Sequence, residues 1–188
     1  MRNAEATKER ILEVAMAEFS SYGIAGARVD RIAKQAGCNK NLIYIYFENK
    51  ETLFTTVLQK NLTRVYEEIT FTPDDLPGFA ARVFDWAMTH PDIIRLMEWN
   101  KLENKVDNLT ARASVQDKKI KMLKTAQKTG LNGSFTPEFL LSFIMTMATA
   151  WSGINPFALS LDSDDEKMLL QTRNAIVEVV KMITQRAE

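Results

Sequence analysis

Apolar residues recur at steps of three and four positions along almost the whole chain, which is the spacing of helices with one buried face. The first run extends from Thr7 to Tyr22, and its apolar positions are Ile11, Leu12, Ala15, Phe19 and Tyr22. Gly23 follows directly, at a place where a glycine commonly ends a helix. The pattern therefore predicts a first helix over residues 7–22.

Two short runs come next, over residues 29–36 and 40–47. Gly37 lies between them and tolerates the left-handed backbone of a tight turn, and Asn39 is a suitable N-cap for the second run. The small core that the two runs would share consists of Ile32, Cys38 and Ile43, with Ala33 at their close approach. Short helices joined in this way are typical of a helix-turn-helix.

The remaining segments keep the helical period. Asn49 is placed to cap a long fourth helix that ends at Thr72-Pro73. Beyond it, helices are predicted over residues 74–89, 92–103, 109–129, 137–153 and 164–186. Their expected start signals are Pro91, Thr136 before Pro137, and a capping box of Ser163 with Glu166.

No segment alternates apolar and polar residues as an exposed strand would, so the predicted fold class is all-α. We expect about nine helices in two domains. A three-helix unit with the helix-turn-helix occupies residues 1–50, and a long helix joins it to a C-terminal helical domain within residues 51–188.

Composition places the chain among ordinary globular proteins, with 46% hydrophobic and 26% charged residues. No stretch approaches the roughly 18 consecutive apolar residues of a membrane span, and the polar start of the chain lacks the apolar segment of a secretory signal. A single cysteine, Cys38, agrees with a reducing compartment. These features predict a cytoplasmic protein without a membrane partner.

The formal net charge is zero, so the total gives no support for a nucleic-acid partner. Residues 1–60 hold nine Lys or Arg against seven Asp or Glu, an excess too small to decide the question. A basic surface would have to arise from local folding.

The sequence contains few of the residues and motifs that enzymes use for catalysis. The chain contains one histidine and one cysteine, and it lacks the glycine-rich phosphate loops and the HExxH metal motif. The acidic run at residues 162–166 lacks the glycine and distal glutamate of a calcium loop, and His90 stands at a helix junction. We expect no catalytic site, no metal and no cofactor.

The second short helix carries the candidate chemistry for DNA recognition. Its outward positions near the N-terminal half are Lys40, Asn41, Tyr44 and Tyr46. Lysine and asparagine can address base edges in the major groove, and tyrosine hydroxyls can donate to phosphate oxygens. This helix is therefore predicted to be the recognition helix, although packing between the short helices is the alternative for the two tyrosines.

A stretch of about 50 residues resembles the DNA-binding domain of TetR-family transcriptional regulators. The resemblance is carried by glycines, caps, apolar positions and a tyrosine pair that occur in register. They lie in the segments Thr7 to Leu12 (TKERIL), Phe19, Tyr22-Gly23, Val29 to Gly37 (VDRIAKQAG) and Leu42 to Phe54 (LIYIYFENKETLF).

The resemblance implies that Lys40, Asn41, Tyr44 and Tyr46 face the DNA and that Asn39 and Lys50 lie at the phosphates. The chain departs from the family pattern where Arg28 and Val29 replace the usual Thr or Ser cap of the second helix. A hydroxyl is lost there and a long cation is gained, so Arg28 is assigned to phosphate contact. The resemblance further implies a homodimer that binds a palindromic double-stranded operator, with a small-molecule effector.

The C-terminal domain is rich in tryptophan and methionine, which together can line an adaptable apolar pocket between helices. A mostly apolar effector is predicted to sit among Trp86, Met97, Trp99, Phe143, Met147 and Trp151. Plain core is the alternative for each of them. A DNA-binding architectural or division factor without ligand control is the alternative function.

Dimerisation is predicted to use the two C-terminal helices, at 137–153 and 164–186, because their broad apolar faces suit a two-fold helical interface. The positions expected in that interface are Ile144, Ala148, Ile176, Val180 and Ile183.

Overall fold

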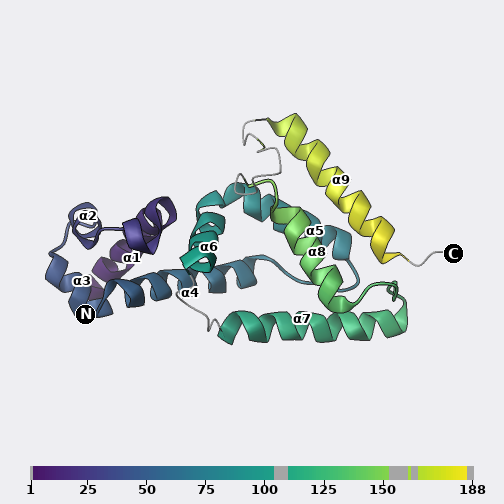
Figure 1. Ribbon diagram of the computed structural model, residues 1–188, viewed down its shortest axis with the longest axis horizontal. Coiled ribbons are helices and arrows are strands. Elements are labelled where there is room, and N and C mark those ends of the chain that lie inside the picture. Colours follow the sequence, from purple (N-terminus) through teal and green to yellow (C-terminus); the bar gives the residue numbers. More distant parts are fainter. Residues whose placement is uncertain (1, 104–109, 153–160, 162–164, 186–188) are drawn as a thin grey trace. The chain divides into compact units, whose positions relative to one another are not determined.

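The computed structural model describes residues 2–103, 110–152, 161 and 165–185. Within these ranges the chain forms nine α-helices and no strand. Figure 1 labels the helices. The all-α prediction is confirmed. The helices are α1 (Arg2–Gly26), α2 (Val29–Gln35), α3 (Lys40–Phe47), α4 (Lys50–Glu68), α5 (Leu76–Thr89), α6 (Pro91–Glu103), α7 (Thr110–Thr129), α8 (Pro137–Thr149) and α9 (Glu166–Thr184). None of the helices in the described part is long and apolar enough to cross a membrane.

The helices form two compact units. The first comprises Met1–Val65 and Asp92–Leu109, and the second comprises Tyr66–Pro91 and Thr110–Glu188. Most of α4 and almost all of α6 therefore pack with the helix-turn-helix. The predicted domain boundary at residue 50 does not coincide with the boundary between the packed units. It divides the chain by expected function, with DNA contact before residue 50 and effector binding after it, and it remains a prediction.

Aromatic packing joins α1 to α4 in the first unit. Phe19 and Phe54 are fully buried, and their rings meet edge to face with centroids 5.1 Å apart. Ile11 and Leu53 are also fully buried. These are the inward positions of the helical period, so the core of this unit lies where the apolar pattern predicts it.

Helix α1 bends at Gly23, where a helix end was predicted. The glycine has φ 65° and ψ −177°, and a further turn of helix follows it to Gly26. A Cβ on Gly23 would lie 2.5 Å from the Glu103 carboxylate and 2.8 Å from the Trp99 ring, so no side chain fits there. The extra turn is stabilised because Glu103 accepts hydrogen bonds from the backbone N–H groups of Ile24 and Ala25.

A buried carboxylate on α1 holds the start of α2. Glu18 is only 4% exposed, and its Oε1 accepts a 2.7 Å hydrogen bond from the backbone N–H of Arg28. The same carboxylate pairs with the Arg31 guanidinium at 2.7 Å. Arg28 is the N-cap residue of α2 and its side chain makes no cap. A carboxylate from another helix therefore satisfies the N–H of the N-cap residue itself, the donor that a Glu or Gln three residues later accepts in a capping box.

Tyr22 was expected on the inner face of α1, and that expectation is wrong. The side chain is 51% exposed, and the Arg31 guanidinium carbon lies 4.3 Å from its ring centroid. Glu18 brings Arg31 to this position, so the ring covers a cation at the surface and does not fill the core.

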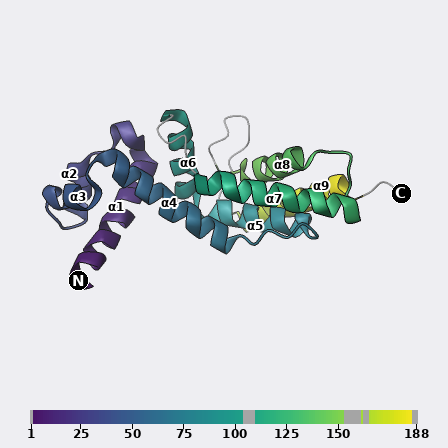
Figure 2. The ribbon, with the colours of Figure 1, turned by 90° about the horizontal axis from the view of Figure 1, so that it is seen from below.

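In the second unit, α5 packs against both α8 and α9, and α7 packs against α8 (Figures 1 and 2). The α5 to α9 contact includes two short bonds from Arg173 Nε to the Asp85 carboxylate, at 2.8 and 3.0 Å. That carboxylate raises the pKa of Arg173. Phe79, Phe84 and Leu140 are fully buried in the unit.

This packing corrects four of the five predicted dimer positions, whereas Ile183 is half-buried. Ile144, Ala148, Ile176 and Val180 are each between 0% and 3% exposed within one chain. They form the inner faces of α8 and α9, so they are not available to a second subunit. Apolar periodicity identifies a helix face that must be covered, and it does not say whether the cover comes from the same chain.

Several predicted helix ends agree with the structure and others differ. Thr136 accepts from the Phe139 N–H and Asn49 from the Thr52 N–H, as caps should. Helix α9 begins later than predicted, because the Asp165 carboxylate accepts from Met168 and is the N-cap. Ser163, the predicted cap, lies outside the described residues.

Candidate nucleic-acid interface

The turn between α2 and α3 has the geometry of a helix-turn-helix. Gly37 has φ 63°, and the Cys38 N–H donates to the Ala33 carbonyl at 3.0 Å. Ile32 and Ile43 are almost fully buried, which fixes the angle between the two helices. Cys38 was expected inside this small core, but it is only half-buried.

Helix α3 is fixed from its inner side and leaves its opposite side open. Ile43 and Phe47 are buried, and the Asn39 side chain caps the helix by accepting from the Asn41 N–H at 2.9 Å. At about 100° per residue, Asn41 and Ile45 point away from Ile43. Asn41 is exposed, Tyr44 is 40% exposed and Ile45 is 73% exposed. Asn41 and Tyr44 therefore lie where the prediction put them.

The sequence analysis did not identify Ile45 as an exposed residue of α3. The signal was present, since Ile45 is two positions after Ile43 and so lies off the buried stripe of a 3.6-residue period.

Lys40 is half-buried, and its ammonium lies 3.0 Å from the Asp30 carboxylate of α2. The hydrogen bond that Lys40 donates to the Asp30 carboxylate raises the pKa of Lys40, so the lysine is positively charged at neutral pH. Both groups lie on the solvent side of the motif. Contact between Lys40 and DNA remains a prediction, in which a base or a phosphate shares the ammonium with Asp30 or displaces it.

The remaining predicted contacts occupy mixed environments. Tyr46 is half-buried, with its ring edge to face on Phe47 at 6.2 Å. Arg28 is exposed at the start of α2. Lys50 is half-buried, and its ammonium donates to the Ala27 carbonyl at 3.3 Å, which ties the first turn of α4 to the end of α1. The assignments of Arg28, Tyr46 and Lys50 to DNA remain predictions.

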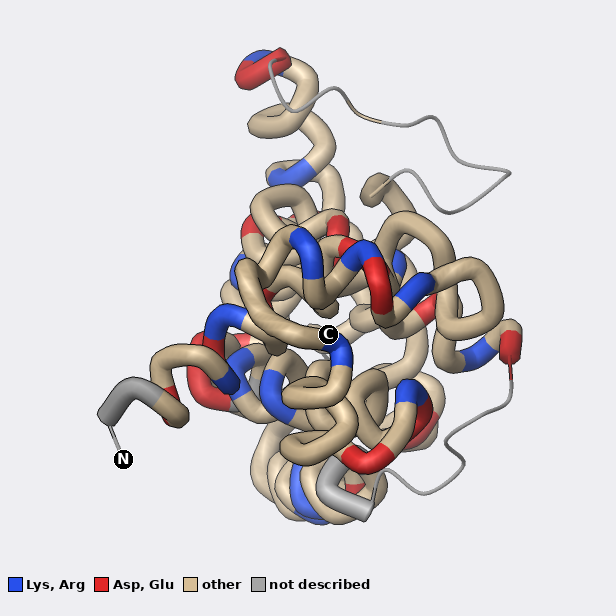
Figure 3. Tube along the Cα trace, turned by 90° about the vertical axis from the view of Figure 1, so that its left-hand side faces the viewer, with Lys and Arg blue, Asp and Glu red and all other residues tan. Residues whose placement is uncertain are grey.

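Acidic and basic residues intermingle along the chain (Figure 3). In the helix-turn-helix this is seen in the Lys40 to Asp30 pair and in the Arg31 to Glu18 pair. Two of the cations are thus engaged within the motif, and long-range charge attraction to DNA is reduced accordingly.

The six predicted effector residues divide between the two units. Met97 and Trp99 belong to the first, and Trp86, Phe143, Met147 and Trp151 belong to the second. The indole N–H of Trp99 donates to the Ser20 carbonyl at 3.2 Å. In the second unit, Trp86 donates to Glu68 Oε2 at 2.8 Å, and Trp151 donates to the Met147 carbonyl at 2.9 Å. Neither unit by itself brings all six together.

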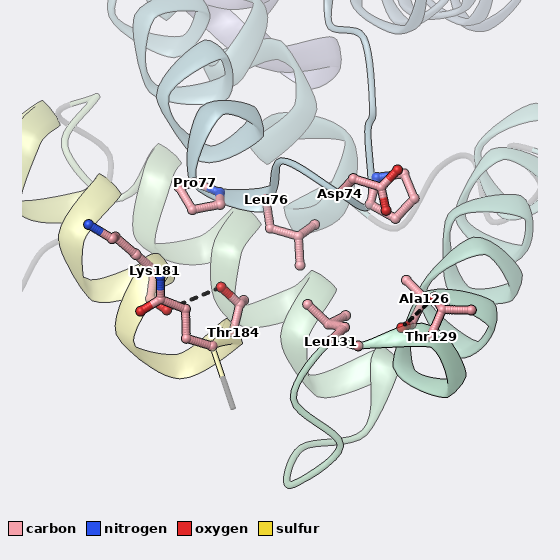
Figure 4. A pocket seen from close by; sticks show the side chains of 11 residues that line it. Asp74, Leu76, Pro77, Ala126, Thr129, Leu131, Lys181 and Thr184 are labelled. Carbon is pink, nitrogen blue, oxygen red and sulfur yellow. Dashed lines mark hydrogen bonds between the residues drawn. The ribbon is translucent and has the colours of Figure 1, made fainter. Parts of the chain in front are cut away.

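The second unit also has an open pocket of about 720 Å³ (Figure 4). Asp74 and Lys181 bring charge to it, and Leu76 and Leu131 bring apolar surface. None of the six predicted effector residues lines it. Its lining comes from the approach to α5 and from the C-terminal ends of α7 and α9, so no local sequence pattern could have indicated it.

Two successive parts of the chain match known protein families. Residues 11–57 match the family described as "Bacterial regulatory proteins, tetR family", and residues 75–181 match "Tetracyclin repressor-like, C-terminal domain". The fold and the helix-turn-helix define a DNA-binding transcriptional regulator. The chain belongs to the TetR family, which confirms the resemblance seen in the sequence.

Two relatives from Streptomyces coelicolor extend over most of the chain. The HTH-type transcriptional repressor SCO4008 is 37% identical over 158 residues, which cover 82% of each chain. The crystal structure of SCO4942, described as a transcriptional regulator, has a TM-score of 0.85 at 35% identity and covers 96% of this chain and 99% of that one. The repressor NicS of Pseudomonas putida is 28% identical over 120 residues, 60% of this chain and 55% of that protein.

Substitution of Asn39 separates its two roles. Asn39→Ala removes the α3 cap and is expected to lower the free energy of unfolding by about 1 kcal/mol. Asn39→Asp keeps a capping oxygen but adds a negative charge where phosphates are expected. Its stability should stay near that of the wild type, while its affinity for DNA should fall by about fivefold or more at low salt.

Chemical denaturation and fluorescence anisotropy with a duplex selected by the wild-type protein measure the two effects. Wild-type affinity in Asn39→Asp would show that Asn39 is a cap and lies away from the phosphates.

Proposed function

We propose that the protein is a transcriptional repressor that binds a palindromic operator as a homodimer and is released by a small-molecule effector. The observation that carries the proposal is the outward side of α3, which presents Asn41, Tyr44 and Ile45 to solvent from a helix held at both ends. Exposed donors, acceptors and apolar groups on one short rigid helix suit the major groove. The relatives SCO4008 and NicS are both named repressors, which supports repression rather than activation.

An exposed stripe on α9 supports the homodimer. Met168, Val179 and Met182 are 47%, 37% and 74% exposed, and Ala175 is exposed between them. Steps of seven, four and three residues place all four on one side of the helix, separate from the buried face. An apolar stripe on a helix next to α8 suits a two-fold interface, and a two-fold dimer reads an inverted repeat.

The effector is proposed to bind the second unit beside α8. Phe143, Met147 and Trp151 are half-buried on one stretch of this helix and the turn after it, so the chain itself leaves part of their apolar surface uncovered. Trp86 lies on α5, which packs on α8, and its own ring is buried and stacked on His90. Half-covered aromatic and thioether groups favour a mostly apolar small molecule.

Selection of duplexes from random DNA by the purified protein tests operator binding and symmetry together. The wild type is expected to enrich an inverted repeat. Val179→Glu places a charge in the proposed interface, so it should give a monomer in sedimentation and lose enrichment of the paired half-sites. Asn174→Glu adds the same charge to an exposed position of α9 outside the stripe and should behave as the wild type.

A selected sequence without two-fold symmetry, or a Val179→Glu protein that remains dimeric, would contradict the proposed assembly.

Effector control is tested by a thermal-shift screen of small molecules followed by anisotropy on the selected duplex. A true effector raises the stability of the native protein and lowers its affinity for the duplex by about 5- to 150-fold. Met147→Trp fills the proposed site and should abolish both effects with duplex affinity intact. Thr129→Trp obstructs the 720 Å³ pocket instead and should leave both effects unchanged.

If Thr129→Trp abolishes both effects and Met147→Trp leaves them unchanged, the effector binds in the open pocket and not beside α8. If no stabilising compound releases the duplex, the protein acts as a DNA-binding factor without ligand control.

A further inference from the structure

The most exposed aliphatic side chain of the helix-turn-helix lies at the centre of the proposed DNA-binding surface. Ile45 is 73% exposed, whereas the other isoleucines of α2 and α3, Ile32 and Ile43, are at most 1% exposed. From this placement we propose that Ile45 contacts the 5-methyl group of a thymine and makes a T·A pair part of the operator half-site. The inference rests on the proposed binding of DNA by α3 and adds a base preference to it.

The geometry favours a base edge over a phosphate as the contact of Ile45. Asn41 and Ile45 are four residues apart, so both project from one side of α3, and that side is opposite the buried Ile43. Tyr44 lies at the rim of this side and is 40% exposed. When the inner side of a recognition helix is anchored, the opposite side is the one that reaches the floor of the groove.

The chemistry selects thymine among the four bases. An isoleucine side chain can neither donate nor accept a hydrogen bond, and the thymine methyl is the one apolar group that the base pairs present in the major groove. Placing the same side chain against a cytosine amino group or a guanine oxygen would bury a polar group without a partner. The contact with Ile45 therefore favours binding when the base is thymine and disfavours it when the base is one of the other three.

Asn41 limits where the thymine lies. The amide of asparagine suits adenine, through its N6 and N7 atoms. Four residues of helix correspond to about 6 Å along the axis, and successive base pairs are about 3.4 Å apart. The thymine should therefore lie within about two base pairs of the base that Asn41 contacts.

Packing among the residues that the structure describes gives no other reason for an isoleucine here. Solvent-facing helix positions favour long straight side chains, because a β-branched residue loses side-chain freedom in a helix. A single exposed apolar residue would be unremarkable by itself. Ile45 differs because it shares its side of α3 with Asn41, next to the half-exposed Tyr44, in the helix proposed to bind DNA.

The test replaces each thymine of the selected duplex, one position at a time in both half-sites, by deoxyuridine, which lacks only the methyl group. One position is expected to weaken binding by about fourfold for each methyl removed, the equivalent of about 0.8 kcal/mol for one buried carbon. In Ile45→Ala the thymine and deoxyuridine duplexes should bind equally at that position. Leu102→Ala truncates an equally exposed residue, 71%, on α6 and should keep the wild-type response.

Two results would overturn the inference. Either no thymine is sensitive to deoxyuridine in the wild type, or the sensitive position stays sensitive in Ile45→Ala. Failure of the wild type to select any duplex would instead overturn the proposed function, and the inference with it. Since Ile45 is exposed, its truncation should leave the thermal unfolding of the protein unchanged, and equal melting temperatures check that the variant is folded.

Discussion

The position of the recognition helix depends on one buried carboxylate. Glu18 of α1 accepts the backbone N–H of Arg28 at the start of α2 and pairs with Arg31 one turn later. A carboxylate inside a protein is unfavourable unless it is paired and hydrogen-bonded, so Glu18 is stable only when α2 lies in this place. Because α3 packs on α2 through Ile32 and Ile43, the same constraint sets the direction of the side of α3 that carries Asn41 and Ile45.

A second set of contacts supports α1 from α6. Glu103 accepts from the backbone beyond the bend at Gly23, and the Trp99 indole donates to the Ser20 carbonyl. Glu18 and Ser20 lie two residues apart on α1. Glu18 connects α1 to α2, and Ser20 connects α1 to α6. The first unit is held together by polar bonds at specific backbone atoms as well as by the Phe19 and Phe54 contact, and this holds α3 in a fixed position.

Sequence reasoning was most accurate where a local rule decides the structure. Periodicity gave the helices, and side-chain caps at Asn39, Asn49 and Thr136 gave several of their starts. It failed where a distant residue decides: the bend at Gly23 depends on Trp99 and Glu103, and the exposure of Tyr22 depends on Arg31. The apolar faces of α8 and α9 were recognised, but only the packing on α5 shows that Ile144 and Val180 are core and leaves Val179 outside.

The central claim, that Glu18 fixes the start of α2 and through it the recognition helix, is tested most directly by amide hydrogen exchange at Arg28. In the wild type this N–H is bonded to Glu18 at 2.7 Å and should be protected. Glu18→Ala removes a charged acceptor, an interaction of about 2 kcal/mol, so exchange at Arg28 and along α2 should accelerate by about tenfold or more. The matched variant Glu13→Ala, at an exposed position of the same helix, should leave it unchanged. Unchanged exchange at Arg28 in Glu18→Ala would contradict the account.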